Sequence, residues 1–256
     1  MCLAQIQVAT NSIMLAVRPH LCKDLVHIGL FTIYLQFDGV TPEPYKAIRG
    51  YDLLPTKFRA IENLRAAGQH SIVLVPTLVK GTNDSQVGDI VKFASKNLEI
   101  VKGINYQPVS FTGRIDQEER AAKRITIPDV LALLEDQTDN EITRDDFYPI
   151  PFVEPISHLI EAETGRSQPV FTAHPCCGAG TYIYCQGGHM IPITRFLDVE
   201  GLMEKIRQEI DCFDGSMLGK LKMNGMILKH MPRFVDELRA PDNFNLKELI
   251  LSVFIN

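Results

Sequence analysis

Phe31-Thr-Ile-Tyr-Leu-Gln-Phe-Asp-Gly39 is the stretch of sequence that decides the fold. Apolar and polar side chains alternate along it, which is the period of a β-strand with two different faces. One face carries Phe31, Ile33, Leu35 and Phe37. The other face ends in the Gln36 amide and the Asp38 carboxylate, where the strand runs out at Gly39. This pattern predicts an α/β fold, with helices on the apolar side and a ligand at the strand ends.

Composition and charge exclude several classes of function. The chain has 256 residues, of which 45% are hydrophobic, and its net charge is −5. Without a basic cluster, a nucleic-acid partner is not expected. No apolar run reaches the length of about 20 residues that a transmembrane helix needs. Gln5, Gln7 and Asn11 interrupt the apolar N-terminus, so it does not resemble a signal peptide, and we expect a cytoplasmic protein.

Both ends of the sequence differ from the polar, frayed termini that are usual in proteins. A predicted strand over residues 4–10 begins almost at once, and residues 249–256 form an apolar segment with nothing after it. We therefore expect the chain to be truncated at both ends.

Strands and helices alternate through the first half of the chain, which predicts parallel strand pairing. The predicted strands are residues 4–10, 31–37, 71–77 and 101–109. The predicted helices are residues 19–28, a helix from Pro55 that ends at Gly68, and residues 87–98. The segment 40–54 is predicted to be a loop.

The strand faces that point away from the helices are largely polar. They carry Gln5, Gln7, Ala9, Asn11, Tyr34, Gln36, Asp38, Val73, Val75, Thr77, Asn105 and Gln107. A flat sheet covered by helices on both faces prefers apolar residues on both. The shared polar face therefore predicts a partial (β/α) TIM-like barrel whose interior holds a polar ligand. Four strands cannot close a barrel, so the others are missing or come from elsewhere.

The second half is predicted to hold smaller elements. Residues 126–129 resemble a helix capping box, residues 145–151 form a Pro-rich domain edge, and residues 154–163 form a short helix. A hairpin is expected from 181–185 and 189–194, followed by a mostly helical C-terminal region. The predicted domains are the partial barrel (1–150), a cysteine-bearing connector and hairpin (151–197), and a helical, truncated region (198–256).

Several blocks of sequence resemble the radical S-adenosylmethionine (SAM) family. Residues 32–41, 45–50 and 62–68 resemble the middle of a radical SAM barrel of the molybdenum-cofactor-enzyme branch. Residues 73–84, 103–114, 146–151 and 174–182 are similar to archaeal tetraether lipid synthases. The resemblance extends from about residue 4 to about residue 255.

The resemblance implies a radical mechanism. In that family a [4Fe-4S] cluster reduces bound SAM, and the resulting 5'-deoxyadenosyl radical abstracts hydrogen from an unactivated carbon. Tetraether synthases then couple isoprenoid lipid chains. The implied cofactors are thus SAM and [4Fe-4S] clusters, the implied substrate is a lipid or another small molecule, and the implied location is the cytoplasm or, through a lipid substrate, the membrane surface.

The sequence departs from the family at one decisive point, because it contains no Cys-x-x-x-Cys-x-x-Cys loop for the radical cluster. We therefore expect an internal fragment or one piece of a split enzyme, inactive by itself, with the missing N-terminal half on a separate chain. The alternative is a non-catalytic remnant or partial open reading frame. An ordinary metal-free barrel enzyme is a third possibility, although no acid–base pair or nucleophile motif supports it.

Six polar residues at or after the strand ends are candidate SAM contacts: Gln36, Asp38, Asn11, Thr77, Asn83 and Gln107. Three of these six residues also have a structural alternative. Asn83 could cap a helix, Asn11 could make a turn, and Gln107 could form an internal hydrogen bond. Arg49 could bind an anion or brace its loop against Glu43 and Asp52.

The cysteines near residue 180 are candidate metal ligands. Cys177, with Cys176 beside it, suits an iron–sulfur cluster, and Gly178 allows a tight turn around it. Cys176 and Cys185 are weaker candidates than Cys177, and the spacing of the adjacent cysteines does not match a zinc ribbon. The alternative for Cys177 is a buried thiol without a ligand, and His174 before a proline is more typical of a turn.

Overall fold

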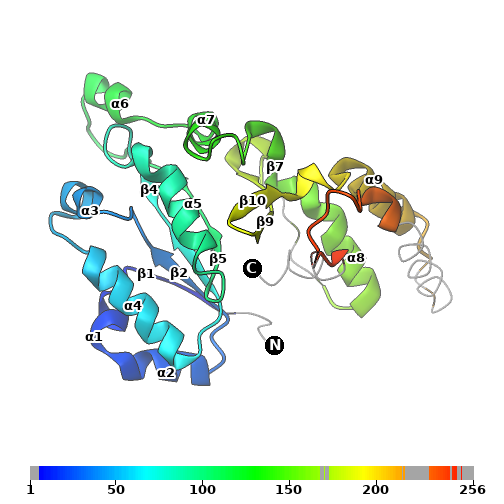
Figure 1. Ribbon diagram of the computed structural model, residues 1–256, viewed down its shortest axis with the longest axis horizontal. Helices are drawn as coiled ribbons and strands as arrows, with labels where there is room; N and C mark the ends of the chain where they lie inside the picture. The colour runs from blue at the N-terminus through cyan, green and yellow to red at the C-terminus, as the bar shows by residue number, and fades with distance from the viewer. Residues whose placement is uncertain are drawn as a thin grey trace. The chain divides into compact units, whose positions relative to one another are not determined.

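The computed structural model describes residues 6–167, 170, 173–214, 216, 231–242, 244–246 and 249. The chain separates into two units, the first ending at Asn140 and the second beginning at Glu141 (Figure 1). Each unit is described separately below. The domain limits expected at residues 150 and 197 stay predictions. In the described part of the chain, no helix is both long and apolar enough to cross a membrane.

The first unit alternates strands and helices. Its strands are β1 (Gln7–Thr10), β2 (Thr32–Gln36), β3 (Ile72–Val75), β4 (Thr77–Leu78), β5 (Val101–Ile104) and β6 (Gln107–Pro108). Its helices are α1 (Ile13–Val17), α2 (Pro19–His27), α3 (Pro42–Arg49), α4 (Leu54–Ala67), α5 (Val87–Ser95), α6 (Gln117–Lys123) and α7 (Ile127–Gln137), with a 3-10 helix η1 (Asp84–Gln86) before α5. The alternation expected from the sequence is therefore confirmed.

All neighbouring strands of the main sheet are parallel, and their order is β1-β2-β3-β5. Two short strands, β4 and β6, also pair in parallel. One residue separates β4 from the end of β3, and two residues separate β6 from the end of β5. The α/β class is thus confirmed. The described strands form an open sheet rather than a closed ring, so the expected barrel is not confirmed.

The apolar side of the sheet forms the core of the first unit. Ile33, Leu35 and Phe37 are fully shielded from solvent, as are Ile72 and Leu74 on the neighbouring strand. They pack against residues of α1, α2, α4 and α5, and Figure 1 shows the first three of these helices gathered beside β1 and β2. The alternate residues Tyr34 and Gln36 remain half-buried on the other side. The two-faced strand expected from residues 31–39 is therefore present.

Helix α3 corrects the prediction of a continuous loop over residues 40–54. Its prolines, Pro42 and Pro44, lie in the first turn, where the backbone N–H groups have no partner within the helix and proline therefore costs nothing. Gly50 ends the helix with φ 86°, a left-handed conformation that favours glycine. Prolines that suggested a loop thus start a helix.

Capping chemistry sets the start of α7 as expected. The Thr126 side chain accepts from the Asp129 backbone N–H, and the Asp129 carboxylate accepts from the Thr126 backbone N–H, which completes a capping box. The C-terminus of α4 is also where the sequence predicts it: Gly68 follows the helix with φ 87° and ends it.

The second unit contains small sheets and two packed helices. Its elements are η2 (Arg144–Asp146), β7 (Tyr148–Pro149), η3 (Ile150–Val153), α8 (Glu154–Thr164), η4 (Pro175–Cys177), β8 (Ala179–Gly180), β9 (Ile183–Gln186), β10 (His189–Pro192), η5 (Ile193–Arg195), α9 (Val199–Asp211) and η6 (Met231–Phe234). The expected hairpin is confirmed as β9-β10. The core of the second unit contains Ile156 and Leu159 from α8 and Leu202 and Ile206 from α9. It also contains Phe196, which lies between these helices in sequence.

The prediction of a mostly helical region from residue 198 onwards is confirmed for α9, and among the other described residues η6, Leu246 and Leu249 are also helical. After η6, Val235 forms a bridge with Leu197, and the chain continues in turns. Much of the remaining region, including residues 217–230 and 250–256, lies outside the described residues.

Replacing Leu35 by alanine tests the packed face of β2. Leu35 is 0% exposed in the core, whereas Leu98 is 43% exposed and serves as the control. We expect Leu35→Ala to lower the free energy of unfolding by about 3 kcal/mol, because it removes buried methyl groups and leaves a cavity. Leu98→Ala should cost less than about 1 kcal/mol. Urea unfolding measures both, and equal losses would contradict the burial of this face.

Candidate functional site

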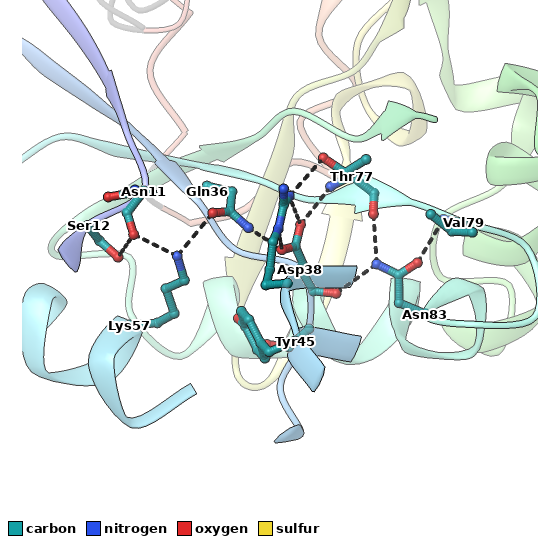
Figure 2. A network of polar contacts seen from close by, with 11 residues as sticks. Asn11, Ser12, Gln36, Asp38, Tyr45, Lys57, Thr77, Val79 and Asn83 are labelled. Carbon is teal, nitrogen blue, oxygen red and sulfur yellow. Dashed lines mark hydrogen bonds and ion pairs between the residues drawn. The ribbon is translucent and has the colours of Figure 1, made fainter. Parts of the chain in front are cut away.

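Buried charged and polar groups gather where the parallel strands of the first unit end (Figure 2). Asp38 follows β2, Thr77 begins β4, and Lys57 projects from the first turn of α4. The side chains of Asp38 and Lys57 are both 0% exposed, which is rare for charged residues unless they are paired. This cluster is therefore the first place to look for function.

The Asp38 carboxylate accepts hydrogen bonds from three other residues of the cluster. It accepts two hydrogen bonds from Arg49, at 2.9 Å from Nε to Oδ2 and 3.2 Å from Nη2 to Oδ1. It also accepts the backbone N–H of Thr77 at 3.2 Å and the side-chain amide of Gln36. A bidentate arginine contact is among the stronger pairings that a carboxylate can make. Asp38 therefore joins the end of β2 to α3 and β4.

Asn83 ties the same loops together through its side chain. Its Nδ2 donates to the Asp38 carbonyl at 2.8 Å and to the Thr77 carbonyl at 2.9 Å. Its Oδ1 accepts from the Val79 N–H at 2.8 Å. The alternative that Asn83 caps a helix is wrong, because its side chain makes no capping bond to η1.

Lys57 lies on the other side of Gln36. Its Nζ donates to the Asn11 carbonyl at 2.8 Å and to Gln36 Oε1 at 3.3 Å, and it lies 5.9 Å from the ring centroid of Tyr45. The pKa of Lys57 is lowered to about 8, mainly by burial; the negative charge of Asp38 opposes this shift, and the positive charge of Arg49 contributes to it.

Tyr45 supports the loop beneath the cluster. Its hydroxyl donates to the Gly39 carbonyl at 2.8 Å, and its side chain is fully buried. Burial raises the pKa of Tyr45, and the nearby Asp38 charge raises it too, so the phenol stays neutral at physiological pH.

The structure brings together most of the residues that the sequence singled out. Gln36, Asp38, Thr77 and Asn83 belong to one network (Figure 2). Asn11 takes part through its backbone carbonyl, while its side-chain oxygen accepts from the Ile13 N–H, as a turn-forming asparagine does.

Gln107 stands apart from the network. It pairs with Thr77 in the β4-β6 register, but its side chain is exposed.

Tyr45 and Lys57 belong to the network but were not predicted from the sequence, and Arg49 was named there only as an anion contact or a loop brace. Arg49 was expected to brace its loop against Glu43 and Asp52, and it pairs with Asp38 instead. Lys57 could have been found from its spacing, since it shares a helix face with buried Ala60, Ile61 and Leu64. A lysine in an apolar stripe needs a buried polar partner.

Only part of the network is open to a ligand. Asp38 and Asn83 are fully buried and already bonded, whereas the Arg49 side chain is 33% exposed. Within the described residues, Arg49 uses Nε and Nη2 for its contacts and leaves Nη1 without one. The half-buried Gln36 and Thr77 lie beside it. The arrangement can therefore present a fixed guanidinium and neutral polar groups to an anionic or polar ligand.

The predicted metal ligands lie in the second unit. Cys176 and Cys177 are in η4 and both are exposed, so the alternative of a buried thiol is wrong for Cys177. The His174 ring accepts from the Cys176 N–H at 3.2 Å, which matches the expected turn role.

No iron–sulfur site is formed by the residues that the structure describes. Among them, no three His, Cys, Asp or Glu side chains come together as a metal site. Two exposed thiols supply half of the usual four cluster ligands. The assignment of Cys176 and Cys177 as ligands therefore stays a prediction.

The second unit also has an open cavity of about 350 Å³, lined by residues 194–198 and 233–236. None of the residues predicted from the sequence to bind SAM or metal lines this cavity.

The buried amine of Lys57 makes stability depend on pH. Its pKa falls from an ordinary value of 10.5 to about 8 on folding. Between these two pH values the unfolded chain binds the proton and the folded protein does not, so stability rises with pH in this window. The contribution is about 3 kcal/mol. We expect Lys57→Met to lose this rise when urea unfolding is measured from about pH 7 to about pH 10.5.

Arg59→Met is the matched control for Lys57→Met, because Arg59 is an exposed cation on the same helix. Its pH curve should run parallel to that of the wild-type protein. Parallel curves for Lys57→Met and wild type would contradict a lowered pKa at Lys57.

Comparison with known proteins finds a strong similarity over nearly the whole chain, although no family model matches. The chain is 48% identical over 252 residues to a 7,8-dihydro-6-hydroxymethylpterin dimethyltransferase of Methanocaldococcus jannaschii. The alignment covers 97% of this chain and 50% of that protein, so the chain spans about half of the relative's length. The expectation that the chain is a fragment stays a prediction.

Weaker matches cover part of the chain. A GTP 3',8-cyclase of Listeria monocytogenes is 27% identical over 108 residues, covering 42% of this chain and 32% of that protein. A probable GTP 3',8-cyclase of Thermococcus kodakarensis is 32% identical over 87 residues, covering 34% of this chain and 28% of that protein. These relatives support the radical SAM family for this chain, and they do not support the tetraether lipid synthases that its sequence blocks resembled.

Proposed function

We propose that the chain forms part of the SAM-binding framework of a radical SAM enzyme that methylates a reduced pterin. The observation that carries this proposal is the 48% identity over 252 residues with a 7,8-dihydro-6-hydroxymethylpterin dimethyltransferase. Similarity of that extent covers both units of the chain. The substrate class of the relative is thus the best guide to the substrate here.

The geometry of the first unit supports a polar ligand at the strand ends. In parallel α/β folds, ligands bind at the carboxyl ends of the strands. There the Nη1 group of Arg49, which makes no contact within the described residues, is suited to a carboxylate such as that of the SAM methionine moiety. Gln36, Thr77 and the exposed Gln107 can serve the hydroxyl and amino groups of the same ligand.

The chain's own residues bind and orient in this proposal. Bound SAM is the source of the 5'-deoxyadenosyl radical in the family that the sequence resembles. Asp38 holds the Arg49 guanidinium in place through two hydrogen bonds, and Asn83 fixes the loops on either side. Buried Asp38 and Asn83 act behind the surface that meets the ligand.

Lipid coupling, which the sequence blocks suggested, is not carried forward. The relative that matches 97% of the chain is named for a pterin substrate. A pterin is flat, polar and rich in hydrogen-bonding groups, whereas an isoprenoid chain offers only apolar surface. The two substrates can therefore be separated by a direct binding measurement.

Binding of SAM and of 7,8-dihydro-6-hydroxymethylpterin to the purified chain tests the proposal. We expect SAM to bind in calorimetry, and Thr77→Val to weaken it several-fold, because the hydroxyl is lost while the backbone bond to Asp38 remains. Arg49→Met should weaken it about tenfold or more. Arg59→Met is the control for charge, since Arg59 is exposed on α4, and should leave affinity unchanged.

The pterin is followed by its own fluorescence, with an isoprenoid lipid as competitor. Binding of SAM and pterin supports the proposal. Absence of SAM binding at millimolar concentration would overturn it, and preference for the lipid would return the substrate to the tetraether class.

The chain by itself is expected to release no 5'-deoxyadenosine from SAM, because it has no Cys-x-x-x-Cys-x-x-Cys loop to hold the reducing cluster. After anaerobic reconstitution with iron and sulfide, chromatography measures this product with dithionite present. We propose that a separate chain carrying such a loop restores the formation of 5'-deoxyadenosine.

Any iron retained by this chain alone should disappear in Cys177→Ala. It should persist in the control Cys212→Ala, because Cys212 is an exposed thiol at the C-terminal end of α9. Formation of 5'-deoxyadenosine by the chain alone would contradict the expectation that it cannot cleave SAM.

A further inference from the structure

The Gln36 amide lies between two groups with opposite hydrogen-bonding character (Figure 2). On one side, Lys57 Nζ donates to Oε1 at 3.3 Å. On the other side, the Asp38 carboxylate accepts from Nε2. An ammonium group can only donate and a carboxylate can only accept, so a single orientation of the amide satisfies both neighbours.

We propose that Lys57 is a positioning residue whose ammonium group holds the Gln36 amide toward Asp38 and thereby keeps the Asp38–Arg49 pair aligned at the strand ends. The inference rests on the proposed function, because the aligned Arg49 is the group that a ligand at the strand ends would meet. Lys57 itself is fully buried and acts only through Gln36.

The surroundings of Lys57 argue against a role in stability alone. In the described part of the chain its hydrogen-bond partners are the neutral oxygens of Asn11 and Gln36. A buried ammonium without a directly bonded carboxylate is costly, and an apolar side chain of similar length would be better tolerated. The lysine therefore contributes something that methionine could not, namely a donor that fixes the amide.

Deprotonation would weaken the hold on the amide. A neutral amine still donates to Gln36 Oε1, but this hydrogen bond is weaker than the one that the ammonium group makes, because it is no longer charge-assisted. The Gln36 NH2 group is then held less firmly against Asp38. The alignment of Arg49 is thus firmest while Lys57 is charged, and it loosens as the pH rises through the pKa of Lys57.

The charged and titratable groups around Lys57 determine the pH at which it loses its proton. Asp38 follows β2, and Arg49 and Tyr45 lie on α3, while Asn11, after β1, presents only a carbonyl. Burial lowers the pKa of Lys57 to about 8, with Arg49 adding to the effect and Asp38 opposing it. Tyr45 has a raised pKa and remains neutral through the transition.

NMR of the full chain tests the coupling without any ligand. The chain is labelled with 13Cδ-glutamine and 13Cε-lysine, and the signals of the two residues are assigned by their loss in Gln36→Leu and Lys57→Met. Titration from about pH 6 to about pH 10 should move the Gln36 carbonyl signal with the same midpoint as the Lys57 signal, near pH 8. Arg59→Met should keep this step, and Lys57→Met should lose it.

A Gln36 signal that stays constant while Lys57 titrates overturns the inference. The wild-type titration decides this even if Lys57→Met fails to fold.

The pH profile of SAM affinity is the second readout. Wild-type affinity should fall about tenfold between pH 7 and pH 9, which corresponds to roughly 1.4 kcal/mol. Lys57→Met should bind weakly at both values, and a Lys57→Met profile equal to that of the wild type overturns the inference. If SAM does not bind at any pH, the proposed function fails, and the labelled glutamine still decides the role of Lys57.

Discussion

The buried carboxylate of Asp38 is the constraint on which the rest of the first unit depends. A fully buried negative charge is tolerated only when protein donors replace the water that it has lost. Those donors come from the Gln36 amide, the Arg49 guanidinium and the Thr77 backbone. To satisfy one side chain, the end of β2, the end of α3 and the start of β4 must all be in place. The strand ends are therefore held as one unit.

The buried Asp38 carboxylate also determines how the partly exposed Arg49 guanidinium is oriented. Because Asp38 accepts hydrogen bonds from both Nε and Nη2 of Arg49, it fixes the orientation of the guanidinium, whose side chain is 33% exposed. Among the described residues, the hydrogen-bond partners of Lys57 are neutral oxygens, one of which belongs to the Gln36 amide. Charge is thus ordered from a buried ammonium, through an amide and a carboxylate, to a half-exposed guanidinium. Such order is suited to holding a polar ligand in one orientation.

This network bears on how far the resemblance of the sequence blocks can be carried. The blocks that carried the resemblance, residues 32–41, 45–50 and 73–84, contain Gln36, Asp38, Arg49 and Asn83. These residues build the framework at the strand ends, which relatives with different substrates can share. None of these four was assigned to a substrate. The proposed substrate class therefore rests on a relative named for a pterin, matched along nearly the whole chain.

The sequence by itself determined the elements whose signals are local. Alternation along residues 31–39 predicted a two-faced strand, the Thr126–Asp129 pair predicted a capped helix, and the order of elements predicted parallel pairing. Helix α3 was missed because a proline stops a helix in its interior and permits one at its start, and only the following turns distinguish the two cases. The tertiary structure alone decided that Arg49 pairs with Asp38 and that Lys57 reaches Gln36, because these contacts join residues 11 and 21 positions apart. Their energies depend on burial, and burial is a property of the packed sheet and its helices rather than of any one segment.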